Sequence, residues 1–204
     1  MKFQAILLFG APGSGKGTQG SIIGRIPGFV HIACGEIFRS LRVGSPLGRT
    51  FLDYSSRGEL VPDDFTIELW YDYIEGMVKS KHLDRQSDTV VLDGIPRNVA
   101  QARLMEEYIK VKRVYCLECA NREVMIGRLK RRALHENRLD DANDAVIKNR
   151  LDVYEAETAP VLDYYSNDIV RRIDTGRTPV EVLADILADI KTIVLEDPHH
   201  GSQE

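Results

Sequence analysis

The sequence predicts an α/β fold in which a five-stranded parallel sheet lies between layers of helices. Short apolar runs alternate along the chain with longer segments of helical periodicity, which is the pattern of successive βαβ units. The runs Ala5–Phe9 and Val90–Leu92 are hydrophobic without a break, as expected of strands that are buried on both faces. The 204 residues, 43% of them hydrophobic, suit a single globular domain with inserted segments.

Five strands and eight helices account for most of the chain. The apolar runs predict strands at Phe3–Phe9, Phe29–Ile32, Thr89–Leu92, Arg113–Leu117 and Ile169–Ile173. The segments between them predict helices at Lys16–Ile26, Glu36–Arg42, Pro46–Ser56, Asp64–Lys79, Val99–Ile109, Arg122–His135, Ala142–Ser166 and Pro179–Leu195. The last helix has a strong start signal, because Thr178 and Glu181 form a capping box and Pro179 stands at the first helical position. We expect one domain over residues 1–195 and a polar tail over residues 196–204.

The connection between the second and third strands is unusually long. Residues 33–88 provide room for three helices, whereas a simple crossover between parallel strands needs only one. We expect this insertion to form a lobe beside the sheet. A second and much shorter interruption, residues 136–141, separates two of the later helices.

The charge and cysteine content exclude several classes of protein. The 27 basic and 31 acidic side chains give a formal net charge of −4, whereas a protein that binds duplex nucleic acid over its surface would carry a basic excess. No apolar run approaches the roughly 20 residues of a membrane-spanning helix, so we expect neither a nucleic acid nor a membrane as partner. Three cysteines, an odd number, favour a reducing compartment, and the cytoplasm is the expected location.

A glycine-rich loop, Gly10-Ala11-Pro12-Gly13-Ser14-Gly15-Lys16-Gly17-Thr18, joins the first strand to the first helix. Glycines let the backbone approach an anion closely, and the N–H groups of a helix N-terminus carry partial positive charge. The spacing Gly-x4-Gly-Lys is the P-loop pattern, in which the lysine reaches the β- and γ-phosphates of a nucleoside triphosphate. Gly17 stands where serine or threonine usually follows that lysine. The loop therefore predicts a site for a nucleoside triphosphate.

The third strand runs into a carboxylate, Asp93. In P-loop enzymes an aspartate at this place supports Mg²⁺, directly or through a water. The alternative is that Asp93 caps the next helix. The residues that follow, Gly94-Ile95-Pro96-Arg97, place an arginine just beyond the strand, at the edge where open α/β sheets bind their ligands.

Five motifs occur in order along the chain: residues 10–19 (GAPGSGKGTQ), 33–39 (ACGEIFR), 58–63 (GELVPD), 93–101 (DGIPRNVAQ) and 138–141 (RLDD), with Arg150 and Tyr154 further along. Together they resemble the adenylate kinase family. The resemblance covers nearly the whole chain and implies a short-lid nucleoside monophosphate kinase. It implies a monophosphate-binding lobe at residues 33–88, a short lid at residues 132–141, and a monomer that transfers a phosphoryl group from ATP to AMP to give two ADP.

The resemblance also implies roles for individual residues. ATP would be bound by the P-loop and three arginines: Gly13, Ser14, Gly15, Lys16, Gly17, Thr18, Arg128, Arg132 and Arg177. AMP would be bound by Cys34, Gly35, Arg39, Glu59, Leu60, Val61, Gly94, Ile95, Pro96, Arg97, Gln101, Arg138 and Arg150. The catalytic residues would be Lys16, Arg97, Arg132, Arg138 and Arg150. Asp93 would hold Mg²⁺ through a water, and no structural zinc is expected, because the zinc ligands that some lids carry do not occur here.

The arginines also indicate phosphate chemistry without the resemblance. The chain has 18 Arg and 9 Lys, and the guanidinium fork pairs with phosphate oxygens at two points. Arg128 and Arg132 are four residues apart and therefore share a helix face, and no acidic residue interrupts residues 128–132. The alternative is a solvated basic face.

Two features leave the acceptor base open. Cys34 stands where adenylate kinases usually have threonine, and Asn98 matches the pyrimidine monophosphate kinases of the same fold. Gln101, however, is the residue of adenylate kinases and suits a two-point contact with adenine. AMP is the preferred acceptor, and a UMP/CMP-type kinase is the alternative. A nucleotide-binding protein without turnover is the rival from another class.

Overall fold

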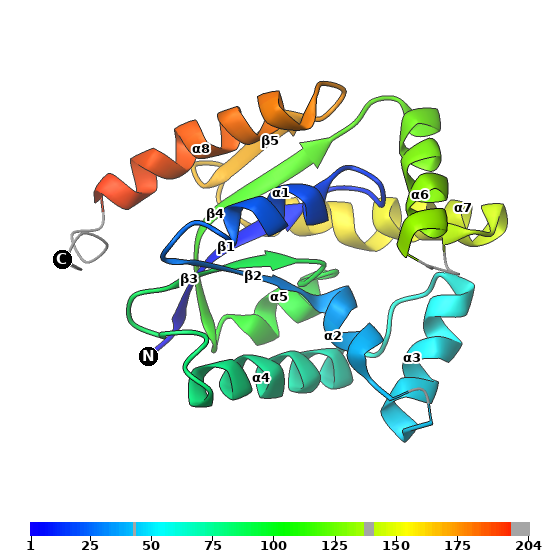
Figure 1. The fold of residues 1–204 in the computed structure, drawn as a ribbon, viewed down its shortest axis with the longest axis horizontal. Helices are drawn as coiled ribbons and strands as arrows, with labels where there is room; N and C mark the ends of the chain where they lie inside the picture. The colour runs from blue at the N-terminus through cyan, green and yellow to red at the C-terminus, as the bar shows by residue number, and fades with distance from the viewer. Residues whose placement is uncertain (43, 137–140, 197–204) are drawn as a thin grey trace.

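The computed structural model describes residues 1–42, 44–136 and 141–196 and confirms the predicted α/β fold (Figure 1). The described strands form one five-stranded parallel sheet in the order β2-β3-β1-β4-β5. Their bounds are β1 Phe3–Phe9, β2 Phe29–Ala33, β3 Thr89–Asp93, β4 Ile109–Glu118 and β5 Val170–Asp174. The strand that precedes the glycine-rich loop is therefore the central one.

Helices cover both faces of the sheet because the apolar side chains of each strand alternate between the faces. On one face, Ile6 and Leu8 of β1 pack with Ile23 of α1 (Lys16–Ile23) and Ile186 of α8 (Pro179–Glu196). On the other face, the core contains residues of α2 (Cys34–Ser40), α4 (Asp63–Lys79), α5 (Val99–Met105) and the segment at residues 159–164. The helices that follow β1 and β3 thus lie on opposite faces, which leaves a crevice between these two strands at their carboxyl ends.

Three loops begin side by side at this edge of the sheet. In the register of the strands, Asp93 at the end of β3 is paired with Leu8 of β1 and with Ala33 of β2. The glycine-rich loop, the start of α2 and the segment after Asp93 therefore leave the sheet at the same level. The topology alone brings the sequence motifs of residues 10–18, 34–39 and 94–97 together.

The long connection after β2 contains three helices, the number that its length predicts. They are α2, α3 (Pro46–Arg57) and α4. Phe38 joins them, since its ring stacks on Phe51 of α3 at 5.1 Å and lies 6.0 Å from Phe65 of α4. Trp70 on α4 is completely buried in the core.

Three of the expected helices were predicted too long. The helix expected at Lys16–Ile26 ends at Ile23. The helix expected at Val99–Ile109 ends at Met105, because Ile109 already begins β4. The segment expected as one helix, Ala142–Ser166, consists of α7 (Asp144–Val153), a π-helical turn (Tyr154–Thr158) and a 3-10 helix (Ala159–Tyr164). Pro160 lacks the N–H that a continuing α-helix needs. The sequence pattern predicts helical periodicity here but does not indicate this change of helix type.

The helix ends follow local side-chain chemistry. The predicted capping box of α8 is confirmed: Thr178 N donates to Glu181 Oε2 at 2.9 Å, and Glu181 N donates to Thr178 Oγ1 at 3.4 Å. The remaining helix, α6, spans Arg122–Glu136 and lies beside the glycine-rich loop (Figure 1). None of the described helices is long and apolar enough to cross a membrane.

Candidate functional site

The loop between β1 and α1 packs tightly against its surroundings. Gly10, Gly13 and Gly15 have φ values of 145°, 83° and 103°, which side chains larger than hydrogen rarely allow. A Cβ on Gly10 would lie 2.5 Å from the carbonyl oxygen of Leu117, and one on Gly13 would lie 2.7 Å from that of Met125. Glycine is therefore required at both positions for the loop to fit between β4 and α6.

Lys16 lies folded over this loop. Its Nζ donates to the carbonyl oxygens of Gly10 at 2.6 Å and Ala11 at 3.2 Å. Burial lowers the pKa of Lys16 to about 8 although Asp93 acts to raise it, and the charges of three nearby arginines lower it further. Ser14 Oγ, in the same loop, is buried and has no hydrogen-bond partner among the described residues. The concentrated positive charge and this unpaired hydroxyl favour an anionic ligand here.

Asp93 faces the glycine-rich loop from the neighbouring strand. Its Oδ2 lies 3.6 Å from the place that a Cβ on Gly17 would take. The alternative role, capping of the next helix, is wrong, because Asn98 caps α5 by accepting from Gln101 N at 2.8 Å. Mg²⁺ is typically held by one or two carboxylates, several waters and the phosphates of the substrate. One carboxylate beside the loop fits such an ion, and the described residues hold no group of three His, Cys, Asp or Glu that would bind a metal by themselves.

A cavity of about 790 Å³ extends from the loop across the carboxyl edge of the sheet. All residues expected at ATP line it: Gly13, Ser14, Gly15, Lys16, Gly17, Thr18, Arg128, Arg132 and Arg177. Seven of the residues expected at AMP line it as well: Gly35, Arg39, Leu60, Gly94, Pro96, Arg97 and Arg150. The structure thus brings the two predicted sets together around one space.

A smaller cavity of about 70 Å³ continues under the inserted segment. Its lining adds Cys34, Glu59, Val61 and Gln101, so that among the described members of the AMP set one lines neither cavity. The exception is Ile95, which is buried in the hydrophobic core and lines neither of these cavities. Arg138 lies outside the described residues.

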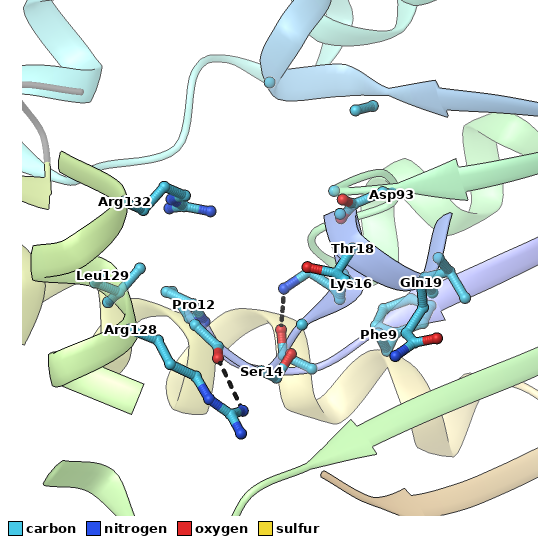
Figure 2. Close-up of a pocket in the computed structure, with 18 of the residues that line it drawn as sticks. Phe9, Pro12, Ser14, Lys16, Thr18, Gln19, Asp93, Arg128, Leu129 and Arg132 are labelled. Carbon is cyan, nitrogen blue, oxygen red and sulfur yellow. Dashed lines mark hydrogen bonds between the residues drawn. The ribbon is translucent and has the colours of Figure 1, made fainter. Parts of the chain in front are cut away.

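Two arginines of helix α6, Arg128 and Arg132, lie beside the loop (Figure 2). Arg128 donates to the carbonyl oxygen of Gly13 at 3.4 Å and to that of Thr175 at 3.0 Å, so it joins the loop to the segment after β5. Arg132, one turn further along, lies on the same side of the helix in Figure 2. Arg128 and Arg132 are therefore part of the cavity wall, whereas Lys130 between them is exposed and pairs with Asp144. Arg177, in contrast, bonds outward to Asp185 Oδ2 at 2.5 Å while it lines the edge of the cavity.

Two arginines of different helices meet on one carboxylate that the sequence analysis gave no role. Asp141 is completely buried; Arg132 Nε donates to its Oδ2 at 2.7 Å, and Arg150 donates to its Oδ1. This bond holds Arg150 of α7 next to Arg132 of α6. In the sequence, the only indication of this residue is the acidic pair at the end of residues 138–141. Its spacing does not predict contacts with Arg132 and Arg150.

The loop after β3 is fixed from two sides. Arg97 Nε donates to Gly94 O at 3.0 Å, and Thr158 Oγ1 donates to Arg97 O at 2.7 Å. Thr158 comes from the π-helical turn, which sequence reasoning had taken as ordinary helix, so its place in the site was missed. Asn98, the feature shared with pyrimidine kinases, lines neither cavity and serves as the cap of α5.

Cys34 and His31 lie on the strand-to-helix segment that borders the site. Cys34 is 3% exposed, and burial raises the pKa of its thiol to about 12. His31 lines the larger cavity, and burial lowers its pKa. A Cβ on Gly20 would lie 2.4 Å from His31 Nε2, an atom with no partner among the described residues. His31 therefore packs against α1 and also forms part of the cavity wall.

Comparison with known proteins gives a consistent assignment. The family model of adenylate kinase matches residues 8–170. The chain is 34% identical over 195 residues to an adenylate kinase of Phocaeicola vulgatus, which covers 92% of this chain and 98% of that protein. It is 34% identical over 192 residues to one of Thermus thermophilus (91% and 96%) and 39% identical over 168 residues to one of Synechococcus (79% and 84%). The extent of these matches, over the core and the loops that form the cavity, shows that this chain belongs to the adenylate kinase family.

Proposed function

We propose that the protein is an adenylate kinase that catalyses the reversible, Mg²⁺-dependent reaction of ATP and AMP to two ADP. The observation that carries the proposal is the single cavity that joins Lys16 and the glycine-rich loop to Arg39 and Arg97 of the acceptor side. Its volume of about 790 Å³ is in the range of small-molecule sites. A phosphoryl donor on the loop and an acceptor at these arginines would share one space.

The chemistry requires alignment and charge neutralisation more than it requires a covalent nucleophile. In this proposal the backbone N–H groups of the loop and Lys16 bind the phosphates of ATP, while Arg39 and Arg97 bind the phosphate of AMP. Arg132 and Arg150, joined through Asp141, lie between the two and stabilise charge on the transferring group. Guanidinium groups suit this role because they stay charged at any working pH.

Magnesium fits the donor side. Asp93 is the carboxylate that would hold it, through a water of its coordination shell, and Gly17 leaves the approach to that carboxylate open. When bound with ATP, the ion would neutralise charge on the β- and γ-phosphates. The protein contributes the orientation of Asp93 at the end of a buried strand.

We further propose a division of labour within the domain of residues 1–195. Residues 33–88 form the monophosphate-binding lobe, and residues 132–141 form a short lid, part of which lies outside the described residues. Residues 196–204 are proposed as a polar tail; Glu196 ends α8. Closure of both lobes over the nucleotides would exclude water and suppress hydrolysis of ATP.

The protein is proposed to act as a monomer in the cytoplasm, with nucleotides rather than nucleic acids or membranes as its partners. The cytoplasmic location is supported by the three cysteines, Cys34, Cys116 and Cys119, which are all free thiols, as suits a reducing compartment. Light scattering during gel filtration tests the oligomeric state directly.

The test of the function is an acceptor panel. Purified protein with MgATP is assayed with AMP, CMP, UMP, GMP and dAMP, and AMP is expected to give the highest kcat/KM. In parallel, Arg97→Met should lower kcat/KM for AMP by about 100-fold or more. Arg103→Met, on the exposed side of the helix that follows, is the matched control and should not change it.

Any other result of the acceptor panel would support one of the alternative functions. Preference for UMP or CMP would establish the pyrimidine kinase, which none of the comparisons favours. Binding of ATP without transfer to any monophosphate would establish a nucleotide-binding protein without turnover.

A further inference from the structure

The amide of Gln101 is held at both of its ends. Its Oε1 accepts from Arg97 N at 2.8 Å, and its Nε2 donates to Asp63 Oδ1 at 2.8 Å. The same Asp63 oxygen accepts from Asn98 Nδ2 at 2.8 Å. Gln101 is 1% exposed and lines the smaller cavity. A residue of the inserted segment thus contacts the side chain that is proposed to read the base.

These partners permit only one orientation of the amide. A backbone N–H can only donate, so the group that faces Arg97 N must be the oxygen. An aspartate carboxylate accepts, so the group that faces Asp63 must be the NH₂. Rotation of the amide by 180° would place oxygen against oxygen at Asp63 and N–H against N–H at Arg97. Both contacts would be repulsive in a buried site.

The fixed amide still has one donor and one acceptor to offer. Oε1 has two lone pairs and Nε2 has two hydrogens, and the protein uses one of each. Adenine presents an amino donor next to a ring-nitrogen acceptor, which matches an amide at two points. A base with a keto group next to a ring N–H presents the reverse pattern and would need the rotated amide.

We propose that Asp63 is a specificity-determining positioning residue, which fixes the orientation of the Gln101 amide so that the acceptor site selects amino bases over keto bases. The proposal rests on the proposed function, since it needs a nucleoside monophosphate in the smaller cavity. It also explains why Asn98 is compatible with an AMP site. Asn98 caps α5 and binds the same Asp63 oxygen, so it supports the orientation of Gln101 rather than contacting a base.

The sharpest probe is inosine monophosphate. Hypoxanthine has nearly the shape of adenine, but an oxygen replaces the amino group and the neighbouring ring nitrogen carries a hydrogen. The measured quantity is the ratio of kcat/KM for AMP to that for inosine monophosphate, with MgATP as donor. The wild-type ratio is expected to be large, because a site built on hydrogen bonds strongly rejects an analogue that leaves them unpaired.

Asp63→Ala should lower this ratio by about tenfold or more, since one of the two contacts that oppose rotation of the amide is lost. The change should lie mainly in the KM for the two acceptors, because base recognition acts equally on the ground state and the transition state. Asp63→Asn keeps an oxygen that accepts from both amides and should retain the wild-type ratio. Asp64→Ala is the matched control: it removes an exposed carboxylate from the same first turn of α4 and should also leave the ratio unchanged.

The outcomes separate this inference from the proposed function. If the wild-type protein does not transfer a phosphoryl group to AMP, the proposed function is wrong. An active wild type whose ratio stays the same in Asp63→Ala would overturn only the role of Asp63, because a purely structural role would reduce both acceptors in proportion. Should the alanine variant lack the wild-type circular dichroism, Asp63→Ser, whose hydroxyl is too short to reach both amides, is measured in its place and judged by the same ratio.

Discussion

Arg132 and Arg150, which lie on different helices, bind opposite oxygens of the buried Asp141 carboxylate. Asp141 therefore holds two guanidinium groups side by side, as the proposed reaction requires. The arrangement also gives Asp141→Asn two consequences. Stability should fall by about 2–3 kcal/mol, because breaking a buried ion pair costs about 3–5 kcal/mol and the arginines are partly exposed. Turnover should fall as well, since the arginines lose their common anchor.

Calorimetric unfolding and steady-state kinetics on Asp141→Asn measure both effects. Asp144→Asn is the control, because it removes an exposed carboxylate that pairs with Lys130 on the surface. A surface pair contributes about 0–1 kcal/mol. Equal stability of the two variants would show that Asp141 does not anchor the arginines.

Lys16→Met should lower kcat by about 10²–10⁴-fold, because a partly buried cation beside the phosphates stabilises the transferring charge. Single-turnover kinetics with saturating ATP and AMP separate this effect from weaker binding. Lys130→Met, on the outer side of α6, keeps the same chemical change at a half-exposed position and should have wild-type kcat. Wild-type kcat in Lys16→Met would remove this lysine from the mechanism.

The lowered pKa of Lys16, about 8, predicts a pH dependence of ATP binding. Below pH 8 the free protein carries the ammonium that attracts phosphate; as pH rises through 8 the proton is lost and the affinity for ATP should fall. Since bound phosphates favour the charged form, binding near pH 8 should take up a proton. Calorimetric titrations in buffers of different ionisation enthalpy measure this uptake, which should be absent from Lys16→Met. A wild-type protein without proton uptake would contradict the assignment.

Cys34→Thr should improve the apparent affinity for AMP modestly. A threonine hydroxyl is a better donor and acceptor than a thiol, and Cys34 lines the smaller cavity beside Gln101. The KM for AMP is compared with that of Cys119→Thr, which changes the same group outside both cavities. A rise in the KM for AMP in the Cys34 variant would indicate a pocket built for another base.

The thiol of Cys34 should also resist alkylation at neutral pH. Its pKa is raised to about 12 and its side chain is nearly inaccessible, whereas the thiolate is the reactive form. Cys119 is partly exposed and should react first with iodoacetamide, as mass spectrometry of the labelled peptides would show. Faster labelling of Cys34 than of Cys119 would contradict the buried placement.

Much of the fold could be predicted because its signals are local. The strand at Phe3–Phe9, the glycine-rich loop and the capping box of α8 each depend on residues close in sequence, and each occurs as predicted. The division of the helix expected at Ala142–Ser166 into α7, a π-helical turn and a 3-10 helix was missed, because helical periodicity does not distinguish these forms.

In the candidate site, too, the residues with local sequence signals could be predicted and the others could not. Residues within a motif, such as Lys16 and Arg97, could be selected from their spacing. Asp63 and Asp141 could not, because each acts through partners on another helix. Gln101 is 38 residues from Asp63 in sequence, and Arg132 and Arg150 lie on either side of Asp141 at nine residues each, which no helix or strand period singles out. Only the folded structure shows that Asp63 contacts Gln101 and that Asp141 contacts Arg132 and Arg150.

The most direct test of the account is the stoichiometry of the purified protein with MgATP and AMP. Phosphorus NMR should show two ADP formed for each AMP consumed, and the same protein given MgADP alone should produce ATP and AMP in equal amounts. Consumption of ATP with release of inorganic phosphate while AMP remains unchanged would contradict adenylate kinase activity.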